Sequence, residues 1–144
     1  MNQEISITVD SVIIKASQNG EGQEVLFIQR KNDPFKNLWA LPGGFLEKDE
    51  VLEEGAKREL EEETGLKVQT LHQIGIFDAI KRDPRGRTIS VAFFGFPGAS
   101  SIIKGNDDAN DAKWFNINNL PELAFDHEDI LKKALETMVE AGYN

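Results

Sequence analysis

The sequence predicts an α/β domain built in layers. Three observations support this fold class: short β-branched segments, two longer segments with helical periodicity, and glycine- or proline-containing turns that separate them. Strands mixed with two sizeable helices are typical of a layered α/β architecture. The chain has 144 residues, and this length fits one domain, so we expect residues 1–144 to form a single domain.

The first half of the chain predicts a hairpin. Residues 5–15 alternate and are rich in isoleucine and valine, which indicates a strand. Residues 17–23 contain Gly20 and Gly22 and form a turn, and residues 25–30 supply the second strand. A loop with Pro34 follows, and we expect Leu41-Pro42-Gly43-Gly44 to form a tight turn that depends on its glycines.

The rest of the chain supplies two helices and the remaining strands. Residues 50–64 predict a helix, and Gly65 fits the left-handed position that commonly follows a helix. Residues 128–141 predict a closing amphipathic helix. Further strands are expected at residues 68–80 (interrupted near Gly75), 88–96 and 112–115.

The composition excludes several classes of protein. There is no cysteine, which rules out disulfides and thiolate metal sites, and no apolar run long enough to cross a membrane. The start of the chain lacks the features of a signal peptide, so we expect a cytoplasmic protein. The net charge of −9 argues against general nucleic-acid binding. Nine of the 25 acidic residues lie between residues 47 and 63.

The acidic residues of the first predicted helix do not share one face. An apolar stripe, expected to face the core, runs through Leu52, Ala56 and Leu60. Glu59 and Glu63 fall within or beside that inward sector, Glu62 lies at its flank, and Glu61 lies opposite, exposed to solvent. Buried carboxylates one helical turn apart need basic partners or cations.

The neighbours of these glutamates favour a cation. Arg58 lies closest to Glu62 and Glu54, its i+4 and i−4 neighbours, so we expect it to brace these two and not the whole cluster. Hard oxygen ligands without cysteine indicate Mg²⁺ or Mn²⁺. Gly43 and Gly44 would let a main-chain carbonyl approach the ion.

Together these residues resemble the Nudix box. Residues 44–66 read Gly44, five residues, Glu50, seven residues, Arg58-Glu59-Leu60, one residue, Glu62-Glu63, one residue and Gly65-Leu66. The resemblance implies an α/β/α sandwich with a mixed β-sheet. It also implies hydrolysis of a nucleoside diphosphate linked to another moiety.

The resemblance also implies roles for individual residues. Glu59, Glu62 and Glu63 match the metal-binding glutamates of the family, and the main-chain oxygen of Gly43 matches a frequent further ligand. Glu50 and Arg58 match positions that support the geometry of the loop and helix. Mg²⁺ would neutralise charge on the diphosphate while a carboxylate orients or deprotonates water. That base is a box glutamate or a residue of the loop containing Asp107, Asp108 and Asp111.

Several segments outside the box resemble the ADP-ribose pyrophosphatase branch: Arg30, Trp39-Ala40-Leu41-Pro42, Arg82-Asp83-Pro84-Arg85-Gly86-Arg87 and Ala124-Phe125-Asp126-His127. That branch splits ADP-ribose into AMP and ribose 5-phosphate. Pro84 is a candidate for the proline that marks this branch. Arginine forks suit phosphate, and the candidate contacts are Arg30, Arg82, Arg85 and Arg87, although a basic turn that balances an acidic protein explains each equally well. Phe35 and Trp39 would stack on adenine or simply pack at the rim. His127 is expected to cap or pack at the start of the last helix.

Two alternatives remain. One is a house-cleaning pyrophosphatase acting on oxidised nucleoside triphosphates. The other is a non-catalytic, ADP-ribose-sensing domain of an NAD-metabolism regulator, against which we count the intact glutamates and the end of the chain at Asn144. The expected partner is a nucleotide or nucleotide-sugar substrate, without nucleic acid or membrane. A homodimer, common in the family, is a further expectation.

Overall fold

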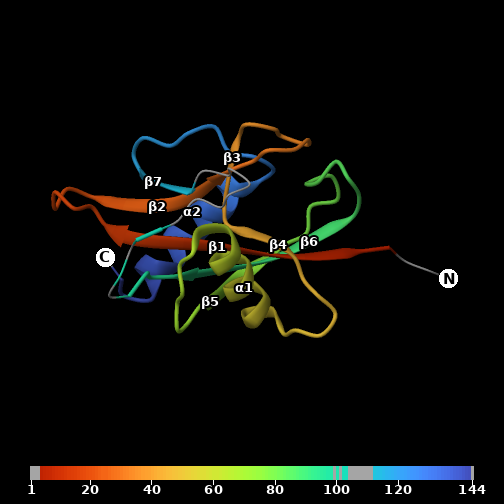
Figure 1. The fold of residues 1–144 in the computed structure, drawn as a ribbon, viewed down its shortest axis with the longest axis horizontal. Coiled ribbons are helices and arrows are strands. Elements are labelled where there is room, and N and C mark those ends of the chain that lie inside the picture. The colour runs from red at the N-terminus through yellow and green to blue at the C-terminus, as the bar shows by residue number, and fades with distance from the viewer. Residues whose placement is uncertain (1–3, 99, 101, 104–111, 144) are drawn as a thin grey trace.

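The computed structural model describes residues 4–98, 100, 102–103 and 112–143. It contains seven strands and two helices in the described residues, and Figure 1 shows their arrangement. The strands are β1 (Ser6–Ala16), β2 (Gln23–Gln29), β3 (Trp39–Ala40), β4 (Gly43–Phe45), β5 (His72–Phe77), β6 (Thr88–Gly95) and β7 (Ala112–Asn116). The helices are α1 (Leu52–Thr64) and α2 (His127–Glu140).

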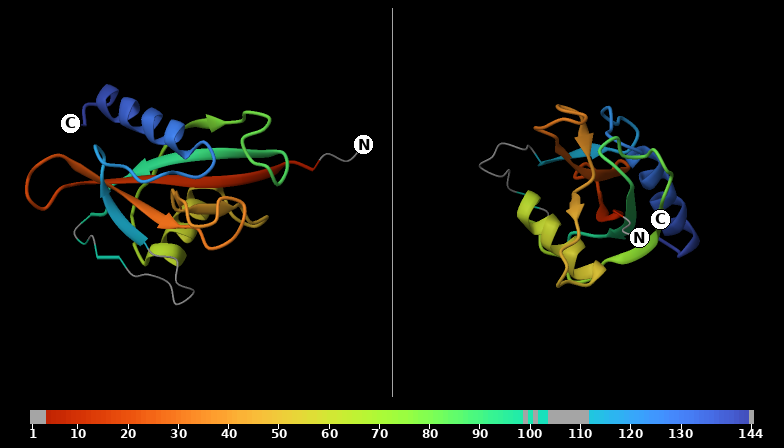
Figure 2. Two further views of the ribbon diagram at one scale, coloured as in Figure 1. Left: turned by 90° about the horizontal axis from the view of Figure 1, so that it is seen from above. Right: turned by 90° about the vertical axis from the view of Figure 1, so that its right-hand side faces the viewer.

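The strands form a mixed sheet with β1 at its centre. The order is β3-β2-β1-β6-β5, while β4 pairs with β1 and β7 pairs with β2. Strand β1 runs parallel to β6 and antiparallel to β2 and β4. Figure 2 shows α1 and α2 on opposite faces of this sheet, so the predicted α/β/α sandwich is confirmed.

Strand β1 is apolar on both faces because each face packs against a helix. Val9 and Ile13 join the cluster under α1, whereas Val12 and Ile14 join the cluster under α2. A charged residue, Asp10, lies among these apolar side chains and is buried, with 5% of its surface exposed. An acidic side chain at such a position requires polar partners.

The sheet splits beside β1, and the split creates the space for a site. Strand β4 pairs with β1 from Thr8 to Asp10, while β2 pairs with β1 only from Ile14 to Ala16. Beyond Val25, β2 leaves β1 and pairs with β3 at Ile28 and Gln29, while β7 pairs with β2 from Glu24 to Ile28. The Leu41-Pro42 segment crosses the gap, where Ser11 N–H donates a 2.9 Å hydrogen bond to the Pro42 carbonyl.

Most predicted elements are confirmed, with shifts of a few residues at their ends. The hairpin of β1 and β2 turns through Gly20 and Gly22, both at positive φ, and Gly65 takes the left-handed conformation after α1. The strand expected over residues 68–80 is shorter, because β5 covers only His72–Phe77 and has a register shift between Gln73 and Gly75.

The tight turn predicted at residues 41–44 is wrong. Gly43 and Gly44 begin the extended strand β4, and neither has a positive φ. Their need for glycine comes from close packing, which is described below. Among the described residues, no helix is both long enough and apolar enough to span a membrane.

Candidate metal and diphosphate site

Helix α1 carries its acidic residues on different sides, as the helical phase predicts. Glu59 is mostly buried, with 16% of its side chain exposed, whereas 58% of the Glu62 side chain is exposed. Glu61 lies on the exposed side of α1. Glu63 reaches the sheet, where its Oε1 accepts a 2.7 Å hydrogen bond from the Gly43 N–H. The acidic face of α1 is thereby attached to the start of β4.

The glycines of β4 allow this close approach. A Cβ on Gly44 would lie 2.7 Å from the Glu59 carboxylate, closer than van der Waals contact permits. A Cβ on Gly43 would collide with the Val9 carbonyl and the Asp10 side chain of β1. The two glycines therefore let β4 lie between β1 and α1 with the carboxylates against its backbone.

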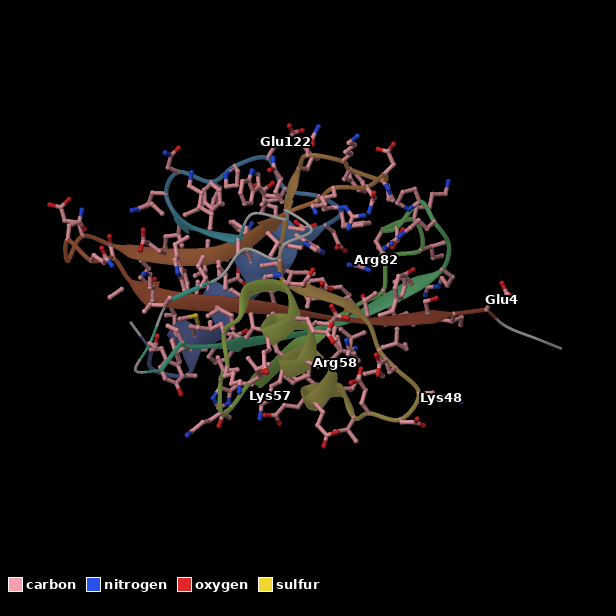
Figure 3. The ribbon with its side chains drawn as sticks, in the orientation of Figure 1. Glu4, Lys48, Lys57, Arg58, Arg82 and Glu122 are labelled. Carbon is pink, nitrogen blue, oxygen red and sulfur yellow. The ribbon has the colours of Figure 1, made fainter. Side chains whose placement is uncertain are left out.

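Arg58 lies on α1 (Figure 3), and its hydrogen bonds connect the loop before α1 with the acidic face of the helix. Its guanidinium makes a bidentate pair with Glu50, at 2.9 and 2.7 Å. It also donates to Glu59 at 2.9 Å and to Glu62 at 3.2 Å. The predicted pair with Glu62 is present, but Glu50 and Glu59 take the place expected for Glu54. The i−4 prediction is wrong because the loop folds back and brings Glu50 within reach.

Burial and repulsion leave the inner carboxylates short of positive charge. Burial, together with the charges of Glu59 and Asp10, raises the pKa of Glu63 to about 8 against the lowering effect of the hydrogen bond from the Gly43 N–H. Burial also raises the pKa of Glu59 despite its bond to Arg58. By contrast, the hydrogen bonds from Arg58 and the Glu47 N–H lower the pKa of Glu50 to about 2. One arginine therefore does not neutralise these carboxylates, and the negative charge that remains favours the binding of a cation.

The donor set fits a hard divalent cation. Glu59, Glu62 and Glu63, with the main-chain oxygen of Gly43, provide only oxygen atoms, which suit Mg²⁺ or Mn²⁺. In the described part of the chain, no three acidic or histidine side chains already converge as ligands. Glu59 and Glu62 are instead directed toward Arg58. A cation would compete with this arginine for both carboxylates.

A pocket of 210 Å³ opens where the sheet splits, next to Glu63. Its walls come from β1, β2, the β3–β4 segment, the loop before β6 and the start of α2. The lining residues are Thr8, Asp10, Ile28, Arg30, Ala40, Leu41, Gly43, Gly44, Phe45, Glu63, Arg82, Asp83, Arg85, Phe125 and His127. A larger hollow of 610 Å³ beside residues 65–70 has no acidic residue or arginine among its described lining, so we place the chemistry in the smaller pocket.

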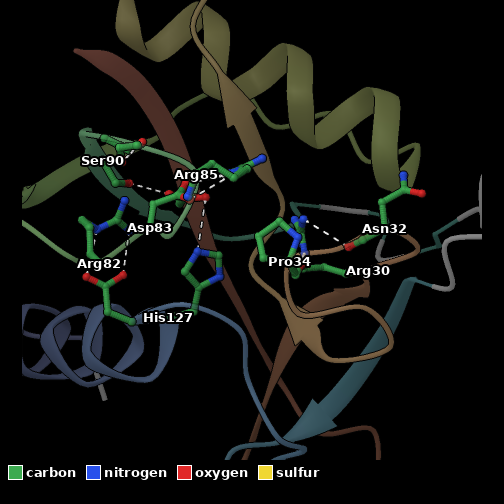
Figure 4. Close-up of polar contacts among 12 residues, drawn as sticks. Arg30, Asn32, Pro34, Arg82, Asp83, Arg85, Ser90 and His127 are labelled. Atoms are coloured by element: carbon green, nitrogen blue, oxygen red, sulfur yellow. Dashed lines mark hydrogen bonds and ion pairs between the residues drawn. The ribbon is translucent and has the colours of Figure 1, made fainter. Parts of the chain in front are cut away.

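Three of the four predicted arginines line this pocket, and each has a different partner (Figure 4). Arg82 is buried and makes a bidentate pair with Asp126, at 2.9 and 2.6 Å. Arg85 pairs with Asp83 at 2.7 Å, while 40% of its side chain is exposed. Arg30 donates a 2.8 Å hydrogen bond to the Pro34 carbonyl.

The two other predicted substrate contacts lie outside the pocket lining. Arg87 donates a 2.7 Å hydrogen bond to the Asp78 carbonyl and holds the loop before β6. Trp39 packs edge-on against Phe115, with ring centroids 4.8 Å apart, within the cluster under α2. Asp107, Asp108 and Asp111, the candidate bases, lie outside the described residues.

Aromatic rings line the same pocket beside the arginines. The Arg85 guanidinium lies 4.9 Å from the ring centre of Phe45 and 5.4 Å from that of Phe125. The Arg30 guanidinium also lies over the Phe125 ring, 4.9 Å from its centre. Burial and the charge of Arg85 lower the pKa of Arg30. An electron-rich ring between two guanidinium groups eases their repulsion and holds both near the pocket.

Sequence reasoning missed several residues of this pocket. Asp10, Phe45, Asp83 and Phe125 come from four separate segments and meet only in the fold. Asp10 alone leaves a local signal, because it interrupts a strand that is otherwise buried and largely apolar. His127 was placed correctly at the start of α2, but its partners were not foreseen.

Comparison with known proteins agrees with this geometry. The profile of the NUDIX domain matches residues 8–137. The chain belongs to the Nudix hydrolase family. It is 44% identical to an ADP-ribose pyrophosphatase of Methanocaldococcus jannaschii over 127 residues, which cover 88% of this chain and 71% of that protein. Members of the family generally use divalent metals, which agrees with the oxygen-rich donor set of this Nudix hydrolase.

A transcriptional repressor and a solved complex with ADP ribose are also similar to this chain. The chain is 38% identical to the ADPR responsive transcriptional repressor NtrR of Acinetobacter baylyi, over 89% of this chain and about half (52%) of that protein. The NUDIX domain of Shewanella oneidensis NrtR, solved in complex with ADP ribose, superposes with a TM-score of 0.86 at 30% identity. That alignment covers 95% of this Nudix hydrolase and 90% of the solved chain.

Proposed function

We propose that this Nudix hydrolase is a Mg²⁺-dependent ADP-ribose pyrophosphatase that converts ADP-ribose and water into AMP and ribose 5-phosphate. The observation that carries the proposal is the position of the buried Glu63 carboxylate, which lines the same pocket as Arg30 and Arg85. A diphosphate placed there would meet cationic groups on one side and cation-holding carboxylates on the other. The similarity to the Methanocaldococcus jannaschii ADP-ribose pyrophosphatase supports this substrate.

In this proposal the box residues divide the work. Glu59, Glu62, Glu63 and the Gly43 carbonyl hold the cation, which when bound supplies charge neutralisation on the diphosphate oxygens. Arg58 and Glu50 hold the helix and its preceding loop in register. A carboxylate of the site accepts the proton of the attacking water. The water oxygen bonds to one phosphorus, and the bond between that phosphorus and the bridging oxygen breaks.

The pocket arginines differ in what they can offer a substrate. Arg82 is already paired with Asp126 and has 3% of its side chain exposed, so we assign it to holding the loop against α2. Arg85 is paired with Asp83 but keeps 40% of its side chain exposed at the pocket, and we propose that it binds a phosphate oxygen. The neighbouring ring of Phe45, with 46% of the residue exposed, then offers a flat apolar surface for the adenine.

The sensor alternative is favoured by one observation, the likeness to the ADP-ribose-bound NUDIX domain of NrtR. An enzyme and a sensor would both bind ADP-ribose, so only turnover separates them. All three box glutamates that the family uses for metal are present here, and a sensor has no need of them. We therefore propose that the protein hydrolyses ADP-ribose. Binding of ADP-ribose without turnover would favour the sensor hypothesis instead.

A substrate panel tests the proposal. AMP release from ADP-ribose and pyrophosphate release from 8-oxo-dGTP are measured side by side, with Mg²⁺ and with a chelator. We expect Mg²⁺-dependent AMP release as the dominant activity. If only 8-oxo-dGTP is hydrolysed, the substrate assignment is wrong. If ADP-ribose binds without turnover, the sensor hypothesis replaces the enzyme hypothesis.

A further inference from the structure

We propose that His127 is a positioning residue that holds the β3–β4 segment, and with it the Gly43 carbonyl, in the geometry that binds the divalent cation. The inference rests on the proposed function, because it concerns the cation site of that reaction. Leu41 lies two residues before Gly43. The Leu41 N–H donates a buried 2.9 Å hydrogen bond to Nδ1 of His127, which is 86 residues away in the sequence.

Each backbone group next to the ligand is held by a different element. Leu41 N–H is held by His127 of α2, the Pro42 carbonyl by Ser11 N–H of β1, and Gly43 N–H by Glu63 of α1. The first contact fixes the peptide group between residues 40 and 41, and the other two fix the peptide group between Pro42 and Gly43, directly before the Gly43 carbonyl. Because the first comes from a side chain, it is the one that a substitution can remove without altering β1 or the box glutamates.

The surroundings of His127 select one form of its ring. Since Nδ1 accepts a hydrogen bond from a backbone N–H, the proton of the neutral ring lies on Nε2. Nε2 faces Asp10 Oδ1 at 3.8 Å, where the carboxylate attracts the Nε2–H without a direct hydrogen bond (Figure 4). Asp10 is itself held, because the Ser90 hydroxyl donates to its Oδ2. The ring is 4% exposed, so solvent does not supply a competing partner.

The segment around His127 is anchored independently, which makes the ring a fixed support. Trp39 N–H and carbonyl pair with Glu122 and Ala124, and Arg82 holds Asp126 by two hydrogen bonds. The backbone before α2 therefore runs beside β3, and this places His127 next to Leu41, between β3 and β4. Outer residues that orient ligands typically change metal affinity by about 10–100-fold when replaced.

The test measures cation affinity without substrate. Mn²⁺ is titrated into the metal-free protein, and the free ion is followed by electron paramagnetic resonance. His127→Phe removes the acceptor and keeps a ring, while His127→Asn returns an acceptor oxygen near the position of Nδ1. We expect His127→Phe to weaken Mn²⁺ binding about tenfold and His127→Asn to recover most of the wild-type affinity.

A matched control separates positioning from general destabilisation. Met138→Ala removes buried side-chain volume from α2 in the cluster under the sheet, away from the pocket. It should lower the melting temperature and leave Mn²⁺ affinity within about twofold. Equal losses of Mn²⁺ affinity in Met138→Ala and His127→Phe, or wild-type affinity in His127→Phe, would overturn the inference.

A second measurement holds even if His127→Phe does not fold. Long-range ¹H–¹⁵N correlation spectra of the wild-type protein report the ring tautomer, and His72→Gln identifies the signal because the chain has only two histidines. An Nε2–H tautomer is expected; an Nδ1–H tautomer overturns the inference while leaving the proposed function intact. Wild-type protein that binds no Mn²⁺ would instead overturn the proposed function and this inference with it.

Discussion

Glu63 makes the stability of the metal-free protein depend on pH. Its pKa rises from 4.5 to about 8 in the folded state because its carboxyl is buried beside other acidic groups. A raised pKa means that the folded state holds the proton more tightly than the unfolded state. The stabilisation is therefore fully present below pH 4.5 and is lost as the pH rises through about 8.

The size of this effect follows from the shift. At about 1.4 kcal/mol per pKa unit, the rise from 4.5 to about 8 corresponds to at most about 5 kcal/mol. Over the window from pH 5.5 to pH 8.5 this shift yields about 3 kcal/mol at most. Since water reaches the pocket and Glu59 and Glu62 are close by, we expect roughly 1–3 kcal/mol. Glu63→Gln removes the titrating group and keeps an oxygen that accepts the Gly43 N–H.

Urea unfolding in the presence of a chelator measures this dependence. Wild-type protein should lose roughly 1–3 kcal/mol of unfolding free energy over this pH range relative to Glu63→Gln. Glu61→Gln, on the exposed side of the same helix, should follow the wild type. Mg²⁺ at about 100 times its dissociation constant should return about 2.7 kcal/mol to the wild type at pH 8.5 and much less to Glu63→Gln. Parallel pH profiles for wild type and Glu63→Gln would refute the reasoning.

Two further predictions separate the roles of pocket residues. Gly44→Ala places a Cβ 2.7 Å from the Glu59 carboxylate; it should lower Mg²⁺-dependent kcat at least tenfold (order of magnitude), and an unchanged kcat would exclude the close approach as a requirement. Arg85→Ala should raise KM for ADP-ribose about tenfold with little change in melting temperature. Arg82→Ala should instead reduce the unfolding free energy by roughly 3–5 kcal/mol, because it leaves Asp126 unpaired beside a buried site; the reverse pattern in the two variants would contradict the assignment.

The parts of the site that the sequence predicts are those set by local geometry. The inward direction of Glu59 and Glu63 follows from the helical period, and Gly65 ends α1 in the expected conformation. Of the two reasons that the sequence suggests for the glycines of β4, the tight turn is wrong, and the approach of the Gly43 carbonyl to an ion stays a prediction. A Gly-Gly pair is compatible with a turn or with close packing, and only the approach of β1 and the Glu59 carboxylate decides between them.

The missed parts depend on contacts between distant segments. Arg58 binds Glu50 because the loop before α1 folds back, a path that helical spacing does not contain. The parallel pairing of β1 with β6 brings Ser90 to Asp10, and the docking of α2 brings His127 there. Phe125 takes a left-handed backbone conformation, with φ of 51°, that no residue preference predicts for phenylalanine.

The central claim is that the inward carboxylates of α1 serve hydrolysis of ADP-ribose, and AMP release by Glu63→Gln tests it most directly. With saturating Mg²⁺ and ADP-ribose, we predict that Glu63→Gln lowers turnover at least ~10²-fold, while Glu61→Gln retains wild-type turnover and circular dichroism shows the fold intact in both. Near-normal AMP release by a folded Glu63→Gln protein would contradict the account.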